Sequence, residues 1–475
     1  MTAPARTAAY RALQAIDRRH LDLPAALAAA RRSMADQRDQ ALTAEIVTGT
    51  LRWRAALDHA VLRVATRPIA AIDPDVLTVL RLSLYQIFHL DRVPASAVVD
   101  DAVNLVRAAR KSSATGFVNA VLRTTLRTRR HAILPARPAD ATDREAALDY
   151  LSVTQSHPRW LVARWLDRYG LDAADAWVQF NNAQAPLTLR ALGPAATETT
   201  PADATADGTT DPSTTGLGAA RDTLAAVLAA QDVHTEPTRW APDGLTVTSG
   251  TPLRDGGHSG YLVQGYLVQD EASQLVALVV GAQPGQRVLD LCAAPGGKTT
   301  ALAAAVGHTG RVVACDSRKA RVALLCDTVR RTGTTNVRIV RADARMGVAV
   351  RPVFDRVLVD VLCSGLGTLR RDPDIKWRRE AADLIALAHD QLAILRHAMQ
   401  AVGPAGRLVY ATCSSEPEEN EDVVHAALAL EPGFRLRRPD PHPALAGFID
   451  EQGAFRTVPF AHGLEAFYAA TLERI

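Results

Sequence analysis

The sequence predicts a multidomain protein: an all-α bundle over residues 1–135, a small α/β module over 136–265, and a doubly wound, Rossmann-like α/β domain over 266–475. The length of 475 residues exceeds what one hydrophobic core usually supports. Apolar residues recur at three- and four-residue spacing through residues 4–130, which is typical of packed helices. From about residue 272, short β-branched runs alternate with helical stretches, which indicates a parallel sheet with helices on both faces.

The first part contains six predicted helices, punctuated by prolines, at residues 7–16, 40–52, 57–64, 74–88, 95–110 and 116–127. Residues 1–130 hold 20 Lys and Arg against 11 Asp and Glu, a net charge of +9, whereas the whole chain carries +3. This concentration of positive charge indicates a polyanion partner such as RNA. The alternative is a purely structural bundle whose arginines are simply solvated.

The middle part is predicted to begin with further helices over residues 131–185, and then to become a small module with one helix and three strands. We expect the helix at 221–230 and the strands at 186–190, 245–248 and 261–268. Residues 193–218 consist mostly of Thr, Ala, Asp, Pro and Gly with almost no large apolar side chain. That composition predicts a disordered insertion.

The last part is predicted to contain five parallel strands, at residues 287–291, 311–314, 337–340, 356–359 and 407–411. Helices are expected at about 298–306, 318–332, 378–402 and 419–430. Ligands of such sheets bind beyond the carboxyl ends of the strands, so residues that follow the strands are the candidates for function.

The composition, with 48% hydrophobic and 22% charged residues, is typical of a globular protein. No run of 18 apolar residues and no apolar leader core is present. We therefore expect a cytoplasmic monomer that binds neither membranes nor DNA.

Aspartates follow the first four strands of the last part, at Asp290, Asp316, Asp343 and Asp360. A row of carboxylates at one sheet edge suits ribose hydroxyls, an adenine amino group or a cationic substrate. For one or two of them, a turn-capping role is the alternative.

The turn from the first strand to the first helix consists of Cys292, Ala293, Ala294, Pro295, Gly296, Gly297 and Lys298. Its two glycines let backbone amides approach a ligand closely at a helix N-terminus. A phosphate-binding P-loop would need glycine at position 292, and the dinucleotide pattern G-x-G-x-x-G is absent. The cofactor that fits best is S-adenosylmethionine, because its sulfonium needs no phosphate site.

Two cysteines, Cys363 and Cys413, follow the fourth and fifth strands and so belong to the predicted ligand edge. Either one alone is explained by packing, but the two together favour covalent catalysis by a thiol. Ser415 and Glu418 have the spacing of a capping box, which is expected to put Cys413 just before a helix N-terminus.

The other cysteines are Cys292, Cys315 and Cys326, which makes five in total with no C-x-x-C pair. Neither a disulfide framework nor a metal site is therefore indicated. We expect Cys315 and Cys326 to be small buried side chains.

Between the two candidate catalytic cysteines, residues 370–377 read Arg-Arg-Asp-Pro-Asp-Ile-Lys-Trp. Cations beside an aromatic residue suit phosphate contacts and base stacking in RNA. A packed lid is the alternative.

Taken in order, these motifs resemble the RNA 5-methylcytosine methyltransferases of the RsmB/NOL/NOP/Sun family. The resemblance covers residues 288–299, the stretch Asp360-x-x-Cys-Ser-Gly-Leu-Gly, residues 372–377, and Tyr410-Ala-Thr-Cys-Ser with Pro417-Glu-Glu-Asn. Residues 4–130 resemble the NusB-like RNA-binding bundle. This combination is similar to the members of the family that act on small-subunit (16S) rRNA.

The resemblance implies a class I S-adenosylmethionine-dependent fold and specific roles. Cys413 would attack carbon 6 of a cytosine, Cys363 would assist release of the adduct, and Asp360 with Lys298 would hold the base. Residues 292–298 would bind the methionine end of the cofactor. Asp316 would hold its ribose and Asp343 its adenine.

Two alternatives remain beside rRNA cytosine-C5 methylation: the same chemistry on tRNA or another RNA, and a non-catalytic NusB-like RNA-binding factor. The chain also departs from the family at Val361-Leu362, where Ala-Pro is usual. Without that proline, we expect the loop that carries Cys363 to be less rigidly extended.

Overall fold

The computed structural model describes residues 2–65, 67–128, 134–193, 218–252, 265–347 and 350–475. The chain divides into two compact units, Met1–Gln184 with Thr368–Ala381 and Ala185–Gly367 with Ala382–Ile475. Residues 136–184 thus join the helical unit, and 185–265 join the unit that contains the large sheet. Of the predicted insertion, residues 194–217 lie outside the described residues.

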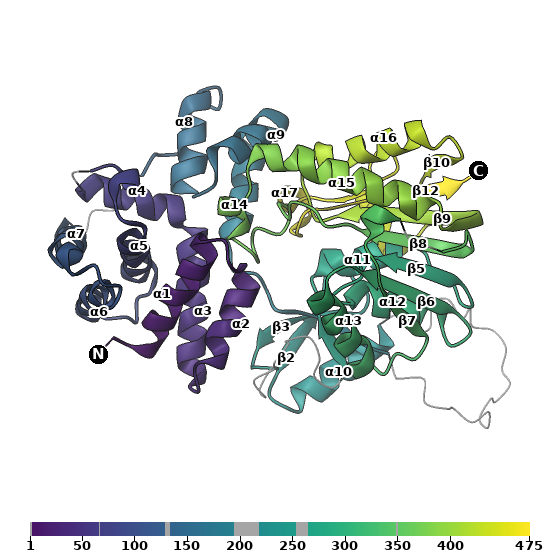
Figure 1. Ribbon diagram of the computed structural model, residues 1–475, viewed down its shortest axis with the longest axis horizontal. Helices are drawn as coiled ribbons and strands as arrows, with labels where there is room; N and C mark the ends of the chain where they lie inside the picture. Colours follow the sequence, from purple (N-terminus) through teal and green to yellow (C-terminus); the bar gives the residue numbers. More distant parts are fainter. Residues whose placement is uncertain (1, 66, 129–133, 194–217, 253–264, 348–349) are drawn as a thin grey trace. The chain divides into compact units, whose positions relative to one another are not determined.

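Seven helices carry the core of the first unit in the described residues: α1 Pro4–Asp17, α2 Leu23–Arg32, α3 Gln37–Arg52, α4 Arg54–Val64, α5 Pro74–His89, α6 Ala95–Ala108 and α7 Thr115–Thr128 (Figure 1). The six predicted helices are all present. Helix α2 was missed, although Asp22 caps it by accepting from the amide of Ala25.

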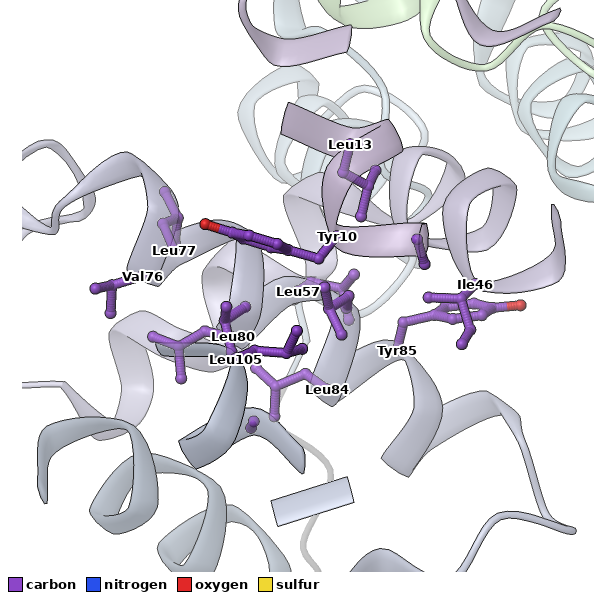
Figure 2. Packing of buried hydrophobic residues seen from close by; sticks show 14 of the residues in the cluster. Tyr10, Leu13, Ile46, Leu57, Val76, Leu77, Leu80, Leu84, Tyr85 and Leu105 are labelled. Atoms are coloured by element: carbon purple, nitrogen blue, oxygen red, sulfur yellow. The ribbon is translucent and has the colours of Figure 1, made fainter. Parts of the chain in front are cut away.

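Helix α5 is the centre of this bundle because every residue from Val76 to Gln86 is buried. A helix that is buried on all sides must be surrounded by other helices. Figure 2 shows Leu80 and Leu84 of α5 among side chains from neighbouring helices, including Tyr10 and Leu57.

The first unit continues with α8 Arg144–Asp149, a π-helical turn Tyr150–Thr154 and α9 Arg159–Asn182. Helix α9 bends at Gly170, which has φ +79°. The short helix α14 Ile375–Arg378 also belongs to this unit, through the segment Thr368–Ala381. No helix within the described residues is both long and apolar enough to span a membrane.

The second unit begins with an antiparallel sheet of order β2-β3-β1-β4, formed by β1 Thr188–Ala191, β2 His234–Pro237, β3 Gly244–Ser249 and β4 Tyr266–Val268. Helix α10 Ala219–Ala229 packs on this sheet through Leu224 and Leu228. The predicted small α/β module is therefore present. Part of its last predicted strand, residues 253–264, lies outside the described residues.

The large sheet has the order β10-β12-β9-β8-β5-β6-β7 in the part of the chain that the structure describes. Its five parallel strands are β5 Arg287–Leu291, β6 Arg311–Asp316, β7 Val337–Arg341, β8 Phe354–Asp360 and β9 Val402–Thr412. All five were predicted. The antiparallel strands β10 Phe434–Arg437, β11 Phe455–Thr457 and β12 Phe467–Arg474 were not.

Side chains that alternate along the central strands fill two cores, one on each face. Val288 of β5 and Leu358 of β8 pack with α11 Glu271–Val279, α12 Gly297–Val306 and α13 Lys319–Arg331. Leu289 and Val357 pack with α15 Ala381–Met399 and α16 Glu421–Leu430 on the other face. The doubly wound prediction is confirmed, because successive side chains of a strand point to opposite faces.

Candidate active site

The sheet changes direction between β5 and β8. From β5 the chain adds β6 and β7 on one side, and it then crosses to add β8 and β9 on the other. Crevices form outside the carboxyl ends of the strands at such a switch point. Asp290 of β5 and Asp360 of β8 both line a pocket there.

The pocket is lined by residues from β4, α11, the turn after β5, α13 and the end of β8: Leu267, Val268, Gln269, Ser273, Asp290, Ala293, Ala294, Pro295, Gly297, Lys298, Thr328 and Asp360. Five of the seven predicted turn residues, 293–295 and 297–298, are among them. Gln269, Ser273 and Thr328 were not predicted. Ser273 lies in the first turn of α11. The N-cap residue of that helix, Asp270, is the feature of the sequence that could have predicted the start of α11.

Lys298 and Asp360 form an ion pair in this pocket. The Nζ of Lys298 donates to Asp360 Oδ2 at 2.8 Å and to Ser273 Oγ at 2.9 Å. Burial alone would lower the pKa of Lys298, but the carboxylate of Asp360 outweighs burial and the pKa is raised overall. Lys298 therefore stays positively charged and fixes the orientation of Asp360.

The turn after β5 has a tightly determined backbone. Cys292 adopts a positive φ of 63°, and the amide of Ala293 donates to the carbonyl of Cys315 at 2.8 Å. Gly296 has φ +107°, and a Cβ there would lie 2.9 Å from Leu325 Cδ1. A side chain at position 296 would thus strain the backbone and collide with α13. Burial raises the pKa of the Cys292 thiol to about 12, so this cysteine stays protonated.

Asp290 and Gln269 each present a buried acceptor atom with no hydrogen-bond partner among the described residues: Asp290 Oδ1 and Gln269 Oε1. The other oxygen of Asp290 accepts from Thr299 Oγ1 at 2.6 Å. Burial raises the pKa of Asp290 to about 7. Unsatisfied polar atoms that line a pocket indicate a ligand that donates hydrogen bonds.

Asp316 and Asp343 lie at the same edge of the sheet but do not line this pocket. Asp316 ends β6 and accepts from the amide of Ala294 at 3.3 Å and from Arg321 Nε at 3.0 Å. Asp343 follows β7 and pairs with Arg345 at 2.8 Å. Asp316 therefore supports the turn after β5, and the cofactor-binding roles of both residues stay predictions.

The two candidate catalytic cysteines lie side by side: the Sγ atoms of Cys363 and Cys413 are 3.3 Å apart. Cys363 is buried, and Cys413 is partly exposed. The hydrogen bond to Cys413, together with burial, raises the pKa of the Cys363 thiol well above its usual value. Cys363 is therefore protonated and can donate in this S–H···S contact.

The α-helix that was expected to begin directly after Ser415 begins later in the chain. Ser415 Oγ donates to Glu416 Oε1, a 3₁₀ turn covers Pro417–Glu419, and α16 begins only at Glu421. Cys413 therefore does not lie just before a helix N-terminus. Two side chains of the stretch Pro417-Glu-Glu-Asn420 bond back to Ser414: Glu419 accepts from its hydroxyl, and Asn420 donates to its carbonyl.

The loop that carries Cys363 is held in place without the family's proline. The amide of Val361 donates to the carbonyl of Ala411 at 3.0 Å, and Gln391 Nε2 donates to the carbonyl of Leu362 at 3.2 Å. Farther along, a Cβ on Gly367 would lie 2.0 Å from the carbonyl oxygen of Ala466. Glycine at 367 is what lets the amide at that position reach the carbonyl of Cys413 at 2.9 Å.

The RNA-contact interpretation of residues 370–377 is wrong for Lys376, which is 1% exposed. Lys376 Nζ donates to the carbonyls of Arg52 and Ser156, each at 2.9 Å. The Nε1 of Trp377 donates to the carbonyl of Leu51 at 2.6 Å. This segment is packed against α3 and the end of α9 in the first unit.

The predicted burial holds for Cys315, which is 1% exposed, but is wrong for Cys326, which is exposed. Cys326 lies on α13 directly after the buried Leu325. One helical step rotates a side chain by about 100°, which is enough to carry it to the solvent face.

The switch-point pocket and the thiol pair that follows β8 and β9 are features of a doubly wound α/β enzyme that binds a ligand at this edge of the sheet. The chain belongs to the family described as 16S rRNA methyltransferase RsmB/F, whose model matches residues 277–473. The model of the NusB family matches residues 3–127. Both predicted resemblances are confirmed.

Two proteins of this family are similar to this chain over most of its length. The probable ribosomal RNA small subunit methyltransferase B of Bacillus subtilis is 31% identical over 93% of this chain and 92% of that protein. The ribosomal RNA small subunit methyltransferase B of Pseudomonas putida is 33% identical over 90% of each chain. A crystal structure of a methyltransferase homolog from Pyrococcus horikoshii matches in fold, with a TM-score of 0.54, 23% identity, and coverage of 70% of this chain and 99% of that one.

Proposed function

We propose that this protein transfers a methyl group from S-adenosylmethionine to carbon 5 of a cytosine in 16S rRNA, through a covalent adduct with Cys413. The observation that carries the proposal is the 3.3 Å separation of the Cys363 and Cys413 Sγ atoms. Two thiols at the ligand edge of the sheet provide a nucleophile and a proton-transfer group in one place. The names of the relatives, small-subunit rRNA methyltransferases, support the substrate.

The pocket residues fit S-adenosylmethionine, because the unpaired acceptors Asp290 Oδ1 and Gln269 Oε1 suit a ligand that carries an ammonium group and ribose hydroxyls. The turn 292–298 and Asp360 would hold the cofactor, with Asp316 and Asp343 at the same sheet edge. When bound, S-adenosylmethionine supplies an electrophilic methyl group on a positively charged sulfur.

Cys413 acts as the nucleophile. Its sulfur forms a bond to carbon 6 of a cytosine that has been flipped out of its stack, and the electrons of the C5–C6 double bond move toward N3. Asp360 bonds the ring near N3, and Lys298 keeps Asp360 in the required orientation. Carbon 5 becomes nucleophilic as a result.

Cys363 acts before and after methylation. Before attack, its S–H can donate to the Cys413 sulfur, which lies 3.3 Å away, and so hold that sulfur in place. Once the sulfur of Cys413 is bonded to carbon 6, the main cause of the raised Cys363 pKa is gone. Cys363 can then lose its proton to water and, as a thiolate, take the proton from carbon 5. The electrons of the C5–H bond re-form the C5–C6 double bond, and the C6–S bond breaks with its electrons leaving on the Cys413 sulfur.

The test uses labelled S-adenosylmethionine and unmodified small-subunit rRNA. Wild type should methylate cytosine, Cys413→Ala should lose transfer by about 10³-fold or more, and Cys363→Ala should accumulate a protein–RNA adduct. Transfer to tRNA but not rRNA would replace the substrate and keep the mechanism. Absence of transfer to any RNA would favour the RNA-binding factor, and full activity of Cys413→Ala would remove the covalent mechanism.

A further inference from the structure

Glu419 is a buried carboxylate with no role in the mechanism described above. It contacts the two loops that carry Cys363 and Cys413, called the cysteine loops below. It ends the 3₁₀ turn Pro417–Glu419 and is 0% exposed. A buried carboxylate is costly to desolvate and persists only where several donors compensate for the lost water. Glu419 has four such donors.

Three of the four donors come from the loops that carry Cys363 and Cys413, and the fourth, Gln391, comes from α15. Oε1 accepts from the amide of Ser364 at 2.7 Å and from Gln391 Nε2 at 2.9 Å. Oε2 accepts from the hydroxyls of Ser364 and Ser414, each at 2.5 Å. The two serine oxygens also lie 3.2 Å apart.

Each serine directly follows a catalytic cysteine: Ser364 follows Cys363, and Ser414 follows Cys413. One carboxylate oxygen thus holds the neighbours of both thiols at once. These loops extend from different strands, β8 and β9, and their separation depends on what joins them beyond the sheet. The carboxylate of Glu419 links Ser364 to Ser414 by charge-assisted hydrogen bonds, which are about twice as strong as neutral ones. It acts beside the bond from the Gly367 amide to the Cys413 carbonyl.

We propose that Glu419 is a positioning residue that sets the approach of Cys363 to Cys413, so that the adduct formed by Cys413 is released. This inference rests on the proposed two-cysteine function. It assigns Glu419 no contact with the RNA or the cofactor. Removal of its charge should loosen the pair and affect most strongly the step that needs both thiols.

The substitution Glu419→Gln is a close match in size and changes one acceptor oxygen into an NH₂ donor. If the NH₂ group replaced Oε1, it would face the amide of Ser364 and the NH₂ of Gln391, which are also donors. If it replaced Oε2, the hydroxyls of Ser364 and Ser414 would have to rotate to accept from it. The backbone carbonyl of Glu419, which accepts from Tyr410 Oη at 2.6 Å, is unaffected. The turn itself should therefore persist.

A matched control is the neighbour Asn420, which is also 0% exposed but bonds only to the Cys413 side. Its Nδ2 donates to the carbonyl of Ser414 at 3.1 Å, and its Oδ1 accepts from Thr412 Oγ1 at 2.5 Å. Asn420→Ala removes buried polar contacts of one loop and leaves the bridge between the loops in place. A general structural defect would appear in both variants.

The experiment measures two quantities on the full-length protein. The first is the fraction of protein trapped as an RNA adduct on a denaturing gel during turnover. The second is the rate at which the azo oxidant diamide links Cys363 to Cys413, which reports their approach without catalysis. Melting midpoints are recorded for every variant.

For Glu419→Gln we expect the trapped adduct to rise and the cross-linking rate to fall, each by about tenfold or more, as the loss of one charge-assisted bond implies. Asn420→Ala should form no excess adduct. Ser364→Ala and Ser414→Ala, which each remove one hydroxyl and keep the carboxylate, should change both quantities in the same direction as Glu419→Gln by a smaller factor.

Wild-type levels of adduct and cross-linking in Glu419→Gln would overturn the inference. So would a lower melting midpoint with reduced turnover and no adduct in Glu419→Gln and both serine variants, because that pattern is loss of structure alone. A failure of the proposed function looks different: wild type would then transfer no methyl group, or Cys413→Ala would remain active.

Discussion

Asp290 is the most deeply buried of the four strand-end aspartates, with 1% of its surface exposed. Its position at the end of β5 was predicted from the sequence, but its burial was not. Burial is also the main reason that its pKa rises to about 7, while the bond from Thr299 opposes the rise. The same type of residue at the end of a neighbouring strand thus has different surroundings: Asp290 accepts from a hydroxyl, whereas Asp360 pairs with Lys298.

This raised pKa predicts a pH-dependent stability. The native state keeps the Asp290 proton from about pH 4 to pH 7, whereas the unfolded chain releases it, so wild type loses stability as the pH rises through that window. A shift of about three pKa units corresponds to about 4 kcal/mol. Asp290→Asn should remove this loss.

Chemical denaturation at pH 4 and pH 8 tests the prediction. The unfolding free energy of Asp290→Asn, relative to that of wild type, should be higher at pH 8 than at pH 4. Asp343→Asn, at an exposed ion pair whose pKa is lowered mainly by its bond to Arg345, should not show that gain. Parallel pH curves for Asp290→Asn and wild type would show that Asp290 ionises normally.

At the scale of residues, the sequence predicted a ligand edge from side chains at or soon after strand ends: Asp360, Cys363 and Cys413, with Lys298 in the first turn of α12. It did not identify Gln269 or Ser273, because they come from the antiparallel module and the start of α11. Their place in the pocket depends on how that module packs on the large sheet. Glu419 was visible only as a negative charge near Cys413, since nothing local shows that it faces Ser364.

At the scale of elements, the five parallel strands were predictable because each is a short run rich in Val, Leu or Ile and helices separate most of them. Strand β10 was missed because it is short and alternates Phe434 and Leu436 with exposed or half-exposed arginines. For residues 370–377, the composition led to the wrong prediction for a different reason. Cations with a tryptophan have the composition of an RNA-binding loop, yet burial turns Lys376 and Trp377 into donors for backbone carbonyls.

The packing of α14 predicts a stability effect for Trp377. Trp377→Ala removes a ring that packs on the helical core and a hydrogen bond to the carbonyl of Leu51. We expect the free energy of local opening at the end of α3 to fall by about 2–4 kcal/mol. Hydrogen exchange of the α3 amides measures this value.

One further variant separates the loss of the ring from the loss of the hydrogen bond, and a second serves as a control at an exposed side chain. Trp377→Phe keeps a ring but removes the N–H, so it should cost about 1 kcal/mol. Leu62→Ala, at a side chain in α4 that is 45% exposed, should change exchange by less than about 0.5 kcal/mol. Unchanged α3 exchange in Trp377→Ala would mean that the segment does not support the bundle.

At the scale of the whole molecule, the helical unit is discontinuous in sequence, because Thr368–Ala381 joins Met1–Gln184. The family models match two separate parts of the chain, 3–127 and 277–473, and the second part contains this segment. A division by sequence motifs therefore assigns residues 368–381 to the catalytic part. Only the tertiary contacts reveal that they complete the helical one.

The discontinuity predicts that residues 1–184 alone form an incomplete unit that a peptide of residues 368–381 completes. Inside this unit, Lys376 Nζ reaches three acceptors, including Asn182 Oδ1 at 3.3 Å, and Asp374 Oδ2 accepts from the amide of Leu23 at 3.2 Å. The peptide should raise the melting midpoint of the fragment in a concentration-dependent way. At a hundredfold excess over Kd, the gain in stability is about 2.7 kcal/mol.

The control is a peptide with Lys376→Ala and Trp377→Ala, which has the same length but lacks the donors to the carbonyls of Arg52, Ser156 and Leu51. It should leave the midpoint unchanged at the same concentrations. A fragment that melts at the same temperature with either peptide would mean that α14 packs on the bundle only because the chain tethers it there. A selective shift would establish that the segment between Cys363 and Cys413 carries a binding determinant for the helical unit, which explains why Lys376 is buried there.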